Sequence, residues 1–168
     1  MESKVIVGLD LGQKGGLVIT QDGKILEMLV MPLVSDNDVN IRSIAKALKK
    51  YDTKNMHVVF EKFGGFFGYQ KSASVSLARQ GGMIEATLIL LGIPFTKVQP
   101  QMWQKVVWEG TNILHKSDGK KDTKKISLVT ANRLFPHETF MPSKAYKKPH
   151  DGLVDAALLA EYGRRKNL

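Results

Sequence analysis

The sequence predicts an α/β protein of one domain, residues 1–168, in which helices flank both faces of a five-stranded mixed sheet. Three apolar, strand-like runs come first, at 5–9, 16–20 and 25–31, and Asp22-Gly23 predicts a tight hairpin turn between the last two. After residue 40, helical and strand patterns alternate, as is typical of right-handed crossover connections. The chain is long enough to bury one sizeable core.

The later elements follow from periodicity and from capping residues. Apolar positions at helical spacing predict a helix over 41–51, capped by Asn40, and a long helix over 72–91 that Gly92 ends. Dense apolar runs predict strands at 56–60 and 93–98. Three further helices are expected: a short one after Pro100, one capped by Asp122 or Thr123, and one from Asp151 to Gly163.

Composition indicates a polyanionic partner. The formal net charge is +9, and residues 97–149 hold ten lysines and one arginine against four acidic residues. A basic surface of this kind attracts nucleic acid, although it can also serve solubility alone. The chain has no cysteine, which excludes a disulfide framework and thiolate metal sites and fits a reducing cytoplasm. No apolar stretch is long enough to span a membrane.

Three carboxylates stand where apolar segments end. Asp10 follows the first strand, Glu61 follows the strand at 56–60, and Asp155 lies on the last helix with Asp151 one turn before it. Carboxylates at the border of a core are costly unless they bind cations, and residues four apart share a helical face. Ordinary edge acids, and for Asp151 a favourable helix-dipole contact, are the alternatives.

Four short blocks carry a family resemblance: Val7–Gly12, Val59–Phe63, Gln99–Lys105 and His150–Leu158. In this order they resemble the ribonuclease H-like superfamily and, within it, the RuvC-type Holliday junction resolvases with their phage and organellar relatives. The similarity covers nearly the whole chain. It implies a ribonuclease H-like fold and a homodimeric endodeoxyribonuclease that resolves four-way DNA junctions by paired nicks. Such an enzyme would act in DNA recombination and repair, in the cytoplasm of a bacterial or phage-infected cell.

The resemblance also implies a catalytic site with two Mg²⁺ ions, for which Mn²⁺ can substitute. Asp10 would bridge both ions, Glu61 would hold one, and Asp155 would complete the site together with Asp151 or His150. Magnesium prefers oxygen ligands, which favours Asp151, whereas His150 can be a ligand or a proton carrier near neutral pH. Many bacterial members space the final acidic pair three residues apart, which here would require an acid at Gly152.

Aromatic and basic residues are expected to contact DNA. Phe66, Phe67 and Tyr69 lie on a glycine-rich segment after Glu61 and can stack on unpaired bases, unless the two phenylalanines cover the core. Trp103 and Trp108 are expected in the core. The predicted phosphate contacts are Lys105, Lys116, Lys120, Lys121, Lys144, Lys147 and Lys148.

The long helix predicted over 72–91 can supply part of a dimer interface. Its residues Met83, Ile84 and Leu88 share an apolar face that would lie at the interface or, equally well, inside the monomer.

Three other functions remain open. One is another nuclease of this fold that acts on RNA–DNA hybrids or on branched DNA, and one is a catalytically silent junction-binding protein. The third is an ATPase of the actin-like class, because Gly8–Gly12 resembles the phosphate loop of such proteins. That class needs two lobes, however, and this chain is long enough for only one.

Overall fold

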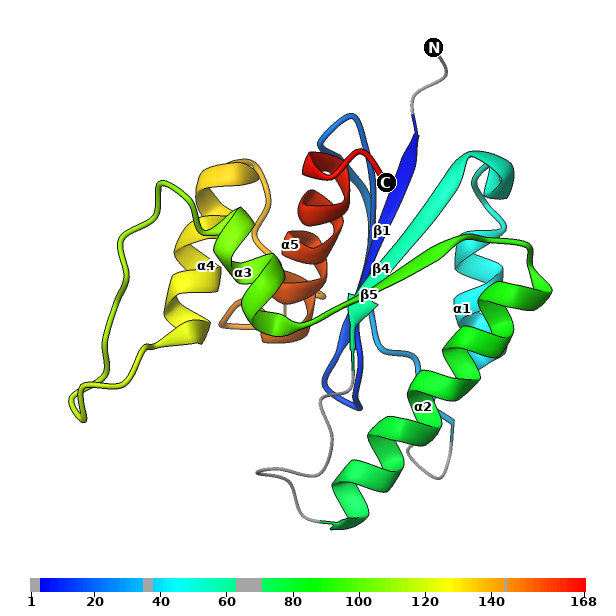
Figure 1. Cartoon of the computed structure of the whole chain (residues 1–168), viewed down its shortest axis with the longest axis horizontal. Helices are drawn as coiled ribbons and strands as arrows, with labels where there is room; N and C mark the ends of the chain where they lie inside the picture. Colours follow the sequence, from blue (N-terminus) through cyan, green and yellow to red (C-terminus); the bar gives the residue numbers. More distant parts are fainter. Residues whose placement is uncertain (1–3, 35–37, 63–70, 144) are drawn as a thin grey trace.

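The structure, a computed structural model, describes residues 4–34, 38–62, 71–143 and 145–168 (Figure 1). Its strands are β1 (Val5–Asp10), β2 (Gly16–Gln21), β3 (Lys24–Val30), β4 (Met56–Glu61) and β5 (Phe95–Val98). Its α-helices are α1 (Ile41–Leu48), α2 (Lys71–Leu90), α3 (Pro100–Val107), α4 (Thr123–Leu134) and α5 (Asp151–Arg165), and a short 3₁₀ turn spans Thr53–Asn55.

The five strands form one mixed sheet in the order β3-β2-β1-β4-β5. β1 pairs antiparallel with β2 and parallel with β4, β2 and β3 are antiparallel, and β4 and β5 are parallel. Asp22 and Gly23 both have positive φ angles, of 53° and 76°, as the predicted hairpin turn requires. The predicted five-stranded mixed sheet is confirmed, and β1 lies at its centre.

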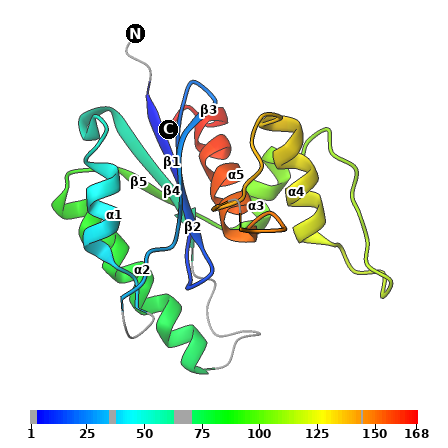
Figure 2. The same cartoon turned by 180° about the vertical axis from the view of Figure 1, so that it is seen from behind.

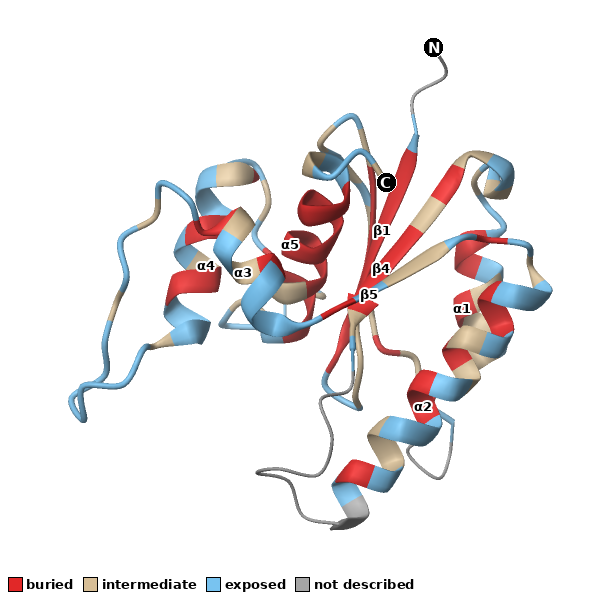
Figure 3. Cartoon of the chain, in the orientation of Figure 1, coloured by how far each residue is buried: buried red, intermediate tan, exposed pale blue. Residues whose placement is uncertain are grey.

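Helices cover both faces of the sheet, as predicted (Figures 1 and 2). α1 and α2 pack on one face, while α5 packs on the other, with α3 and α4 beyond it. Alternation along β1 divides its side chains between two cores: Val7 and Leu9 belong to the core under α1 and α2, and Ile6 belongs to the core under α5. α5 is buried along most of its length (Figure 3).

Glycine lets α5 lie directly against β1. A Cβ atom on Gly8 would stand 1.8 Å from the carbonyl oxygen of Ala156 and 2.5 Å from the backbone nitrogen of Ala160. Any larger residue would therefore push helix and strand apart. The contact aligns Ala156 and Ala160 with the middle of β1, so that the first turns of α5 meet the carboxyl end of this strand.

Several predicted boundaries were wrong. α1 ends at Leu48, β5 begins at Phe95, and α5 continues past Gly163 to Arg165. Gly163 is a packing residue and not a helix stop, because its Cβ would lie 2.8 Å from the Ile6 Cγ2 atom.

The last turn of α5 is held by ion pairs. Arg164 and Arg165 each donate to the buried Glu161 carboxylate, over 2.7 and 2.8 Å. Among the described residues, no helix is long and apolar enough to cross a membrane.

Candidate active site

Asp10 and Glu61 end neighbouring strands at the same edge of the sheet. β1 and β4 run parallel, with Leu9 opposite Phe60, so their carboxyl ends meet. Strand alternation places Asp10 on the face of Ile6 and Glu61 on the face of Val59, and both of these apolar residues belong to the core under α5. The two carboxylates therefore point toward the layer that contains α5.

α5 brings the third and fourth acids to this edge. It begins at Asp151, so Asp151 and Asp155 occupy its first two turns, beside the end of β1. Asp155 is partly buried and accepts a hydrogen bond from the Ser127 hydroxyl of α4, whereas Asp151 is exposed. The site thus combines residues from β1, β4 and α5, and its acids differ in their access to solvent.

Burial and mutual repulsion disfavour the charged forms of the inner acids. The pKa of Asp10 is raised well above its usual value, first by burial and then by the charges of Asp155, Glu61 and Asp151. Burial also raises the pKa of Asp155, to about 6, although the Ser127 hydrogen bond opposes the shift. Burial raises the pKa of Glu61 above its usual value, although a hydrogen bond from Trp103 opposes this shift. A bound cation would favour the charged forms of all three carboxylates and so lower their pKa values.

Sequence reasoning missed three neighbours of the acids: Ser127 beside Asp155, Trp103 and Lys124. Trp103 Nε1 donates to Glu61 Oε1 over 2.7 Å, and Lys124 Nζ donates to Asp151 Oδ2 over 2.6 Å. Trp103 is buried at 1% exposure, as expected of a core residue, but its indole also orients a site carboxylate. Nothing in the sequence distinguishes Lys124 from the other lysines of this basic region.

The donor set fits a magnesium site. Carboxylate oxygens are the ligands that Mg²⁺ prefers, and these carboxylates are held partly out of water. Within the described ranges, no three acidic or histidine side chains are already gathered closely enough to hold a metal ion. Asp10, Glu61 and Asp155 therefore converge on one edge of the sheet without forming a closed cluster.

His150 and Asp151 occupy different environments. His150 is the N-cap of α5 but makes no side-chain cap; its Nδ1 atom is buried without a hydrogen-bond partner in the described structure, and its ring lies edge-on to Tyr146, 6.5 Å between centroids. Asp151 is instead paired with Lys124.

A carboxylate at position 152 is excluded, because a Cβ on Gly152 would stand 2.3 Å from the Lys14 carbonyl oxygen. The loop after β1 therefore rules out the three-residue acidic spacing.

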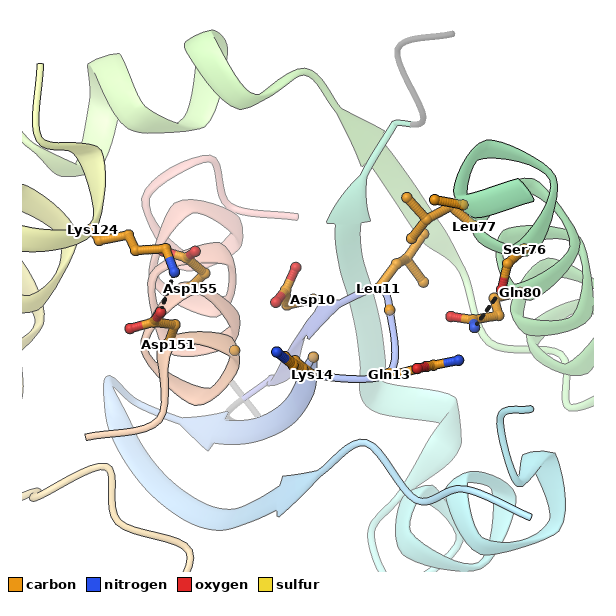
Figure 4. A pocket seen from close by; sticks show the side chains of 14 residues that line it. Asp10, Leu11, Gln13, Lys14, Ser76, Leu77, Gln80, Lys124, Asp151 and Asp155 are labelled. Atoms are coloured by element: carbon orange, nitrogen blue, oxygen red, sulfur yellow. Dashed lines mark hydrogen bonds and ion pairs between the residues drawn. The ribbon is translucent and has the colours of Figure 1, made fainter. Parts of the chain in front are cut away.

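A pocket of about 680 Å³ opens between the acids and α2 (Figure 4). Asp10, Asp151 and Asp155 line one side of it, and Ser76 and Gln80 of α2 line the other. The loop that joins β1 to β2 forms part of the wall, with Gly12 at a φ of +113°, a conformation that glycine adopts readily.

The structure places most of the predicted DNA-binding lysines on the surface. Lys105, Lys116, Lys120, Lys121, Lys147 and Lys148 are exposed, while Phe66, Phe67, Tyr69 and Lys144 lie outside the described residues. Three of these lysines belong to a hairpin-like turn closed by a bridge between His115 and Lys121, which projects away from the body of the molecule (Figure 1). Lys147 and Lys148 line a second pocket, of about 470 Å³, with Tyr146 and His150.

The predicted helical face for dimerisation is mostly inside the monomer. Ile84 and Leu88 are 1% exposed and belong to the core under α1 and α2, so the burial alternative holds for both. Met83 is partly exposed. Trp108 is buried at 8% exposure, as predicted.

The chain has the ribonuclease H-like fold. Its acids lie at the ends of β1 and β4 and at the start of α5. Within that fold, the chain is similar to Thermus thermophilus RuvC in complex with Holliday junction substrate: the TM-score is 0.66 at 15% sequence identity, over 98% of this chain and 94% of that one. Another Thermus thermophilus RuvC structure gives a TM-score of 0.62 at 14% identity, over 97% and 96% of the two chains. The sequence matches no family profile and no curated protein.

Proposed function

We propose that this protein is a metal-dependent endodeoxyribonuclease that resolves four-way DNA junctions by paired nicks. The observation that carries the proposal is the convergence of Asp10, Glu61 and Asp155, whose pKa values are all raised by burial. The fold similarity to RuvC, one of whose structures is a complex with Holliday junction substrate, supports the choice of DNA substrate. The net charge of +9 supports a polyanionic partner.

Two Mg²⁺ ions, or Mn²⁺ in their place, would supply an activated water and stabilise charge on the leaving 3′-oxygen. Asp10 would hold these ions together with Glu61 and Asp155, as the resemblance to RuvC-type resolvases implies. Trp103 fixes the orientation of the Glu61 carboxylate, and Ser127 does the same for Asp155. Lys124 holds Asp151 at the rim of the pocket and adds positive charge where a phosphate would enter.

DNA would reach this site across a basic surface. Lys14 lines both the pocket at the acids and the neighbouring pocket with Lys147 and Lys148, so positive charge continues from one to the other. Tyr146, 47% exposed, offers a ring for stacking beside those lysines. We propose that Phe66, Phe67 and Tyr69 likewise stack on bases, at the centre of the junction. The exposed lysines would contact the phosphates.

Two symmetric nicks require two sites related by a two-fold axis, and α2 offers a surface for that pairing. Val75, Ile89 and Leu90 are 61%, 67% and 86% exposed, and Gly82 and Ala86 are exposed between them. Their spacing of seven, four and three residues places Val75, Gly82, Ala86 and Ile89 on one helical face, where small residues permit close approach of a partner helix. We propose this stripe as the dimer contact, in place of Ile84 and Leu88.

Sedimentation tests the dimer contact. Ile89→Glu should convert a dimer to a monomer and reduce paired nicking more than junction binding by each subunit. Val129→Glu is the matched control, because Val129 is an exposed apolar residue of α4, 44% exposed and away from the stripe. A monomeric wild type, or an unchanged dimer in Ile89→Glu, would remove this interface.

The central experiment incubates the protein with a synthetic four-way junction, a linear duplex and an RNA–DNA hybrid, with Mg²⁺ or with excess chelator. We expect Mg²⁺-dependent nicking of the junction at symmetric positions and little cutting of the other two. Preferred cutting of the hybrid would instead favour an RNA–DNA hybrid nuclease, and tight junction binding with no cutting would favour a silent junction-binding protein. Junction cleavage in excess chelator would refute the metal mechanism.

A further inference from the structure

The wall of the pocket opposite the acids contains a buried polar group that the nuclease chemistry does not use. Gln80, in the middle of α2, is 1% exposed and lines the same pocket as Asp10 and Asp155. Its Nε2 atom donates to Ser76 Oγ over 3.3 Å, while its Oε1 atom has no hydrogen-bond partner in the described structure. A buried acceptor without a donor is unfavourable, so this oxygen is suited to a donor that arrives with a ligand.

The surroundings of Gln80 combine apolar and polar surface. Leu11 and Leu77 line the pocket and bridge the loop after β1 to α2: a Cβ on Gly81 would touch Leu11 Cδ1 at 3.7 Å, and one on Gly12 would touch Leu77 Cδ2 at 3.6 Å. Figure 4 shows the Gln80 amide directed from α2 toward Gln13 of that loop. Apolar side chains beside one fixed amide suit a flat ring with a polar edge, and a pocket of about 680 Å³ is large enough for a nucleotide.

We propose that Gln80 is a specificity-determining residue that selects adenine or cytosine in a nucleotide next to the scissile phosphate. Adenine carries an amino group at C6 and cytosine carries one at C4, and each can donate to the free Oε1. Guanine and thymine carry carbonyl oxygens at the corresponding positions, which would face the Gln80 acceptor unfavourably. In this arrangement the acids on the opposite wall would hold the metal ions that bind the scissile phosphate, so the inference rests on the proposed function.

The test uses junctions that differ only in the base next to the cut, placed in turn on its 5′ and 3′ sides. At one of these positions we expect kcat/KM to be about tenfold higher for adenine and cytosine than for guanine and thymine, the size of one good base contact. Replacing that adenine with purine, which lacks the amino group, should remove the advantage in the wild-type protein. Equal rates for all four bases would overturn the inference and leave the nuclease function intact.

A variant separates selection from packing. Gln80→Met keeps the length of the side chain and removes the amide, so it should lower adenine and cytosine rates to the guanine and thymine level. Gln101→Met, an exposed glutamine of α3, is the matched control and should keep the preference. A Gln80→Met enzyme that retains the base preference overturns the inference. If the variant does not fold, the purine substitution tests the inference in the wild-type protein: loss of the adenine advantage supports it, and an unchanged rate overturns it.

Affinity for the same junctions, measured in chelator, makes the test independent of cleavage. A preference for adenine and cytosine that appears in Kd and disappears in Gln80→Met supports the inference, even if no junction is cut. In that outcome the proposed nuclease function fails while the base selection stands. Kd values that do not depend on the base, together with base-independent cutting, mean that Gln80 only packs in the wall.

Discussion

Replacing Asp155 with asparagine tests whether the acids destabilise the metal-free protein. The pKa of Asp155 is raised from 3.8 to about 6 by burial, so the folded state binds its proton more tightly than the unfolded state does. The stability that comes from this protonation is fully present below pH 3.8 and is lost as pH rises through about 6. At 1.36 kcal/mol per pKa unit, the loss at neutral pH is at most about 3 kcal/mol.

Asparagine imitates the protonated carboxyl at every pH and can still accept the Ser127 hydrogen bond. In chelator at pH 7.5, Asp155→Asn should therefore raise the free energy of unfolding by up to about 3 kcal/mol. For a chain of this size, that corresponds to a rise of roughly 6–12 °C in Tm. At pH 4 the wild type is largely protonated at this site, and the two proteins should differ little.

Magnesium should reverse the comparison at neutral pH. A bound cation stabilises the wild-type protein by about 2.7 kcal/mol at a hundredfold excess over Kd, whereas the variant has lost a ligand and should respond less. Scanning calorimetry measures the Tm of the wild type and of Asp155→Asn, with Mg²⁺ and in chelator, at both pH values. Asp22→Asn, an exposed change in the β2–β3 turn, is the control. A Tm for Asp155→Asn at or below that of the wild type in chelator would refute the reasoning.

Four further outcomes are expected. Asp10→Asn should abolish junction cleavage and leave gel-shift affinity in chelator unchanged, because the basic surface is untouched; loss of binding would mean that the variant does not fold. If Asp151 is a ligand, Asp151→Asn should raise the Mg²⁺ concentration needed for cutting, whereas if His150 is the ligand or proton carrier, His150→Ala should abolish cutting while Asp151→Asn keeps full activity. Trp103→Phe should lower stability by about 1–3 kcal/mol and raise the Mg²⁺ requirement, because the Glu61 carboxylate loses its donor; unchanged values would deny the indole this role. Junction affinity should fall with salt at a log–log slope of about −0.9 per phosphate contacted, and a flat dependence would exclude the lysine contacts.

The fold could be predicted from sequence because its signals are local. Strand alternation, the Asp22-Gly23 turn, and caps at Asn40 and Asp122 each depend on a few neighbouring residues, and the structure shows all of them. The positions of Asp10 and Glu61 at the ends of their strands follow from the same local patterns. The family resemblance placed Glu61 on the strand next to Asp10, and the structure pairs β1 and β4 in parallel.

Tertiary structure alone decided the rest. Gly163 looked like a helix stop because glycine often ends helices, but here it makes room for Ile6. Trp103 of α3 reaches Glu61 from 42 residues away in sequence, and Lys124 of α4 reaches Asp151 from 27 residues away, so no spacing reveals them. Gln80 is one polar residue among several on α2, and only the packing of that helix buries its acceptor at the pocket. Such contacts depend on how whole elements are placed, which short sequence patterns do not encode.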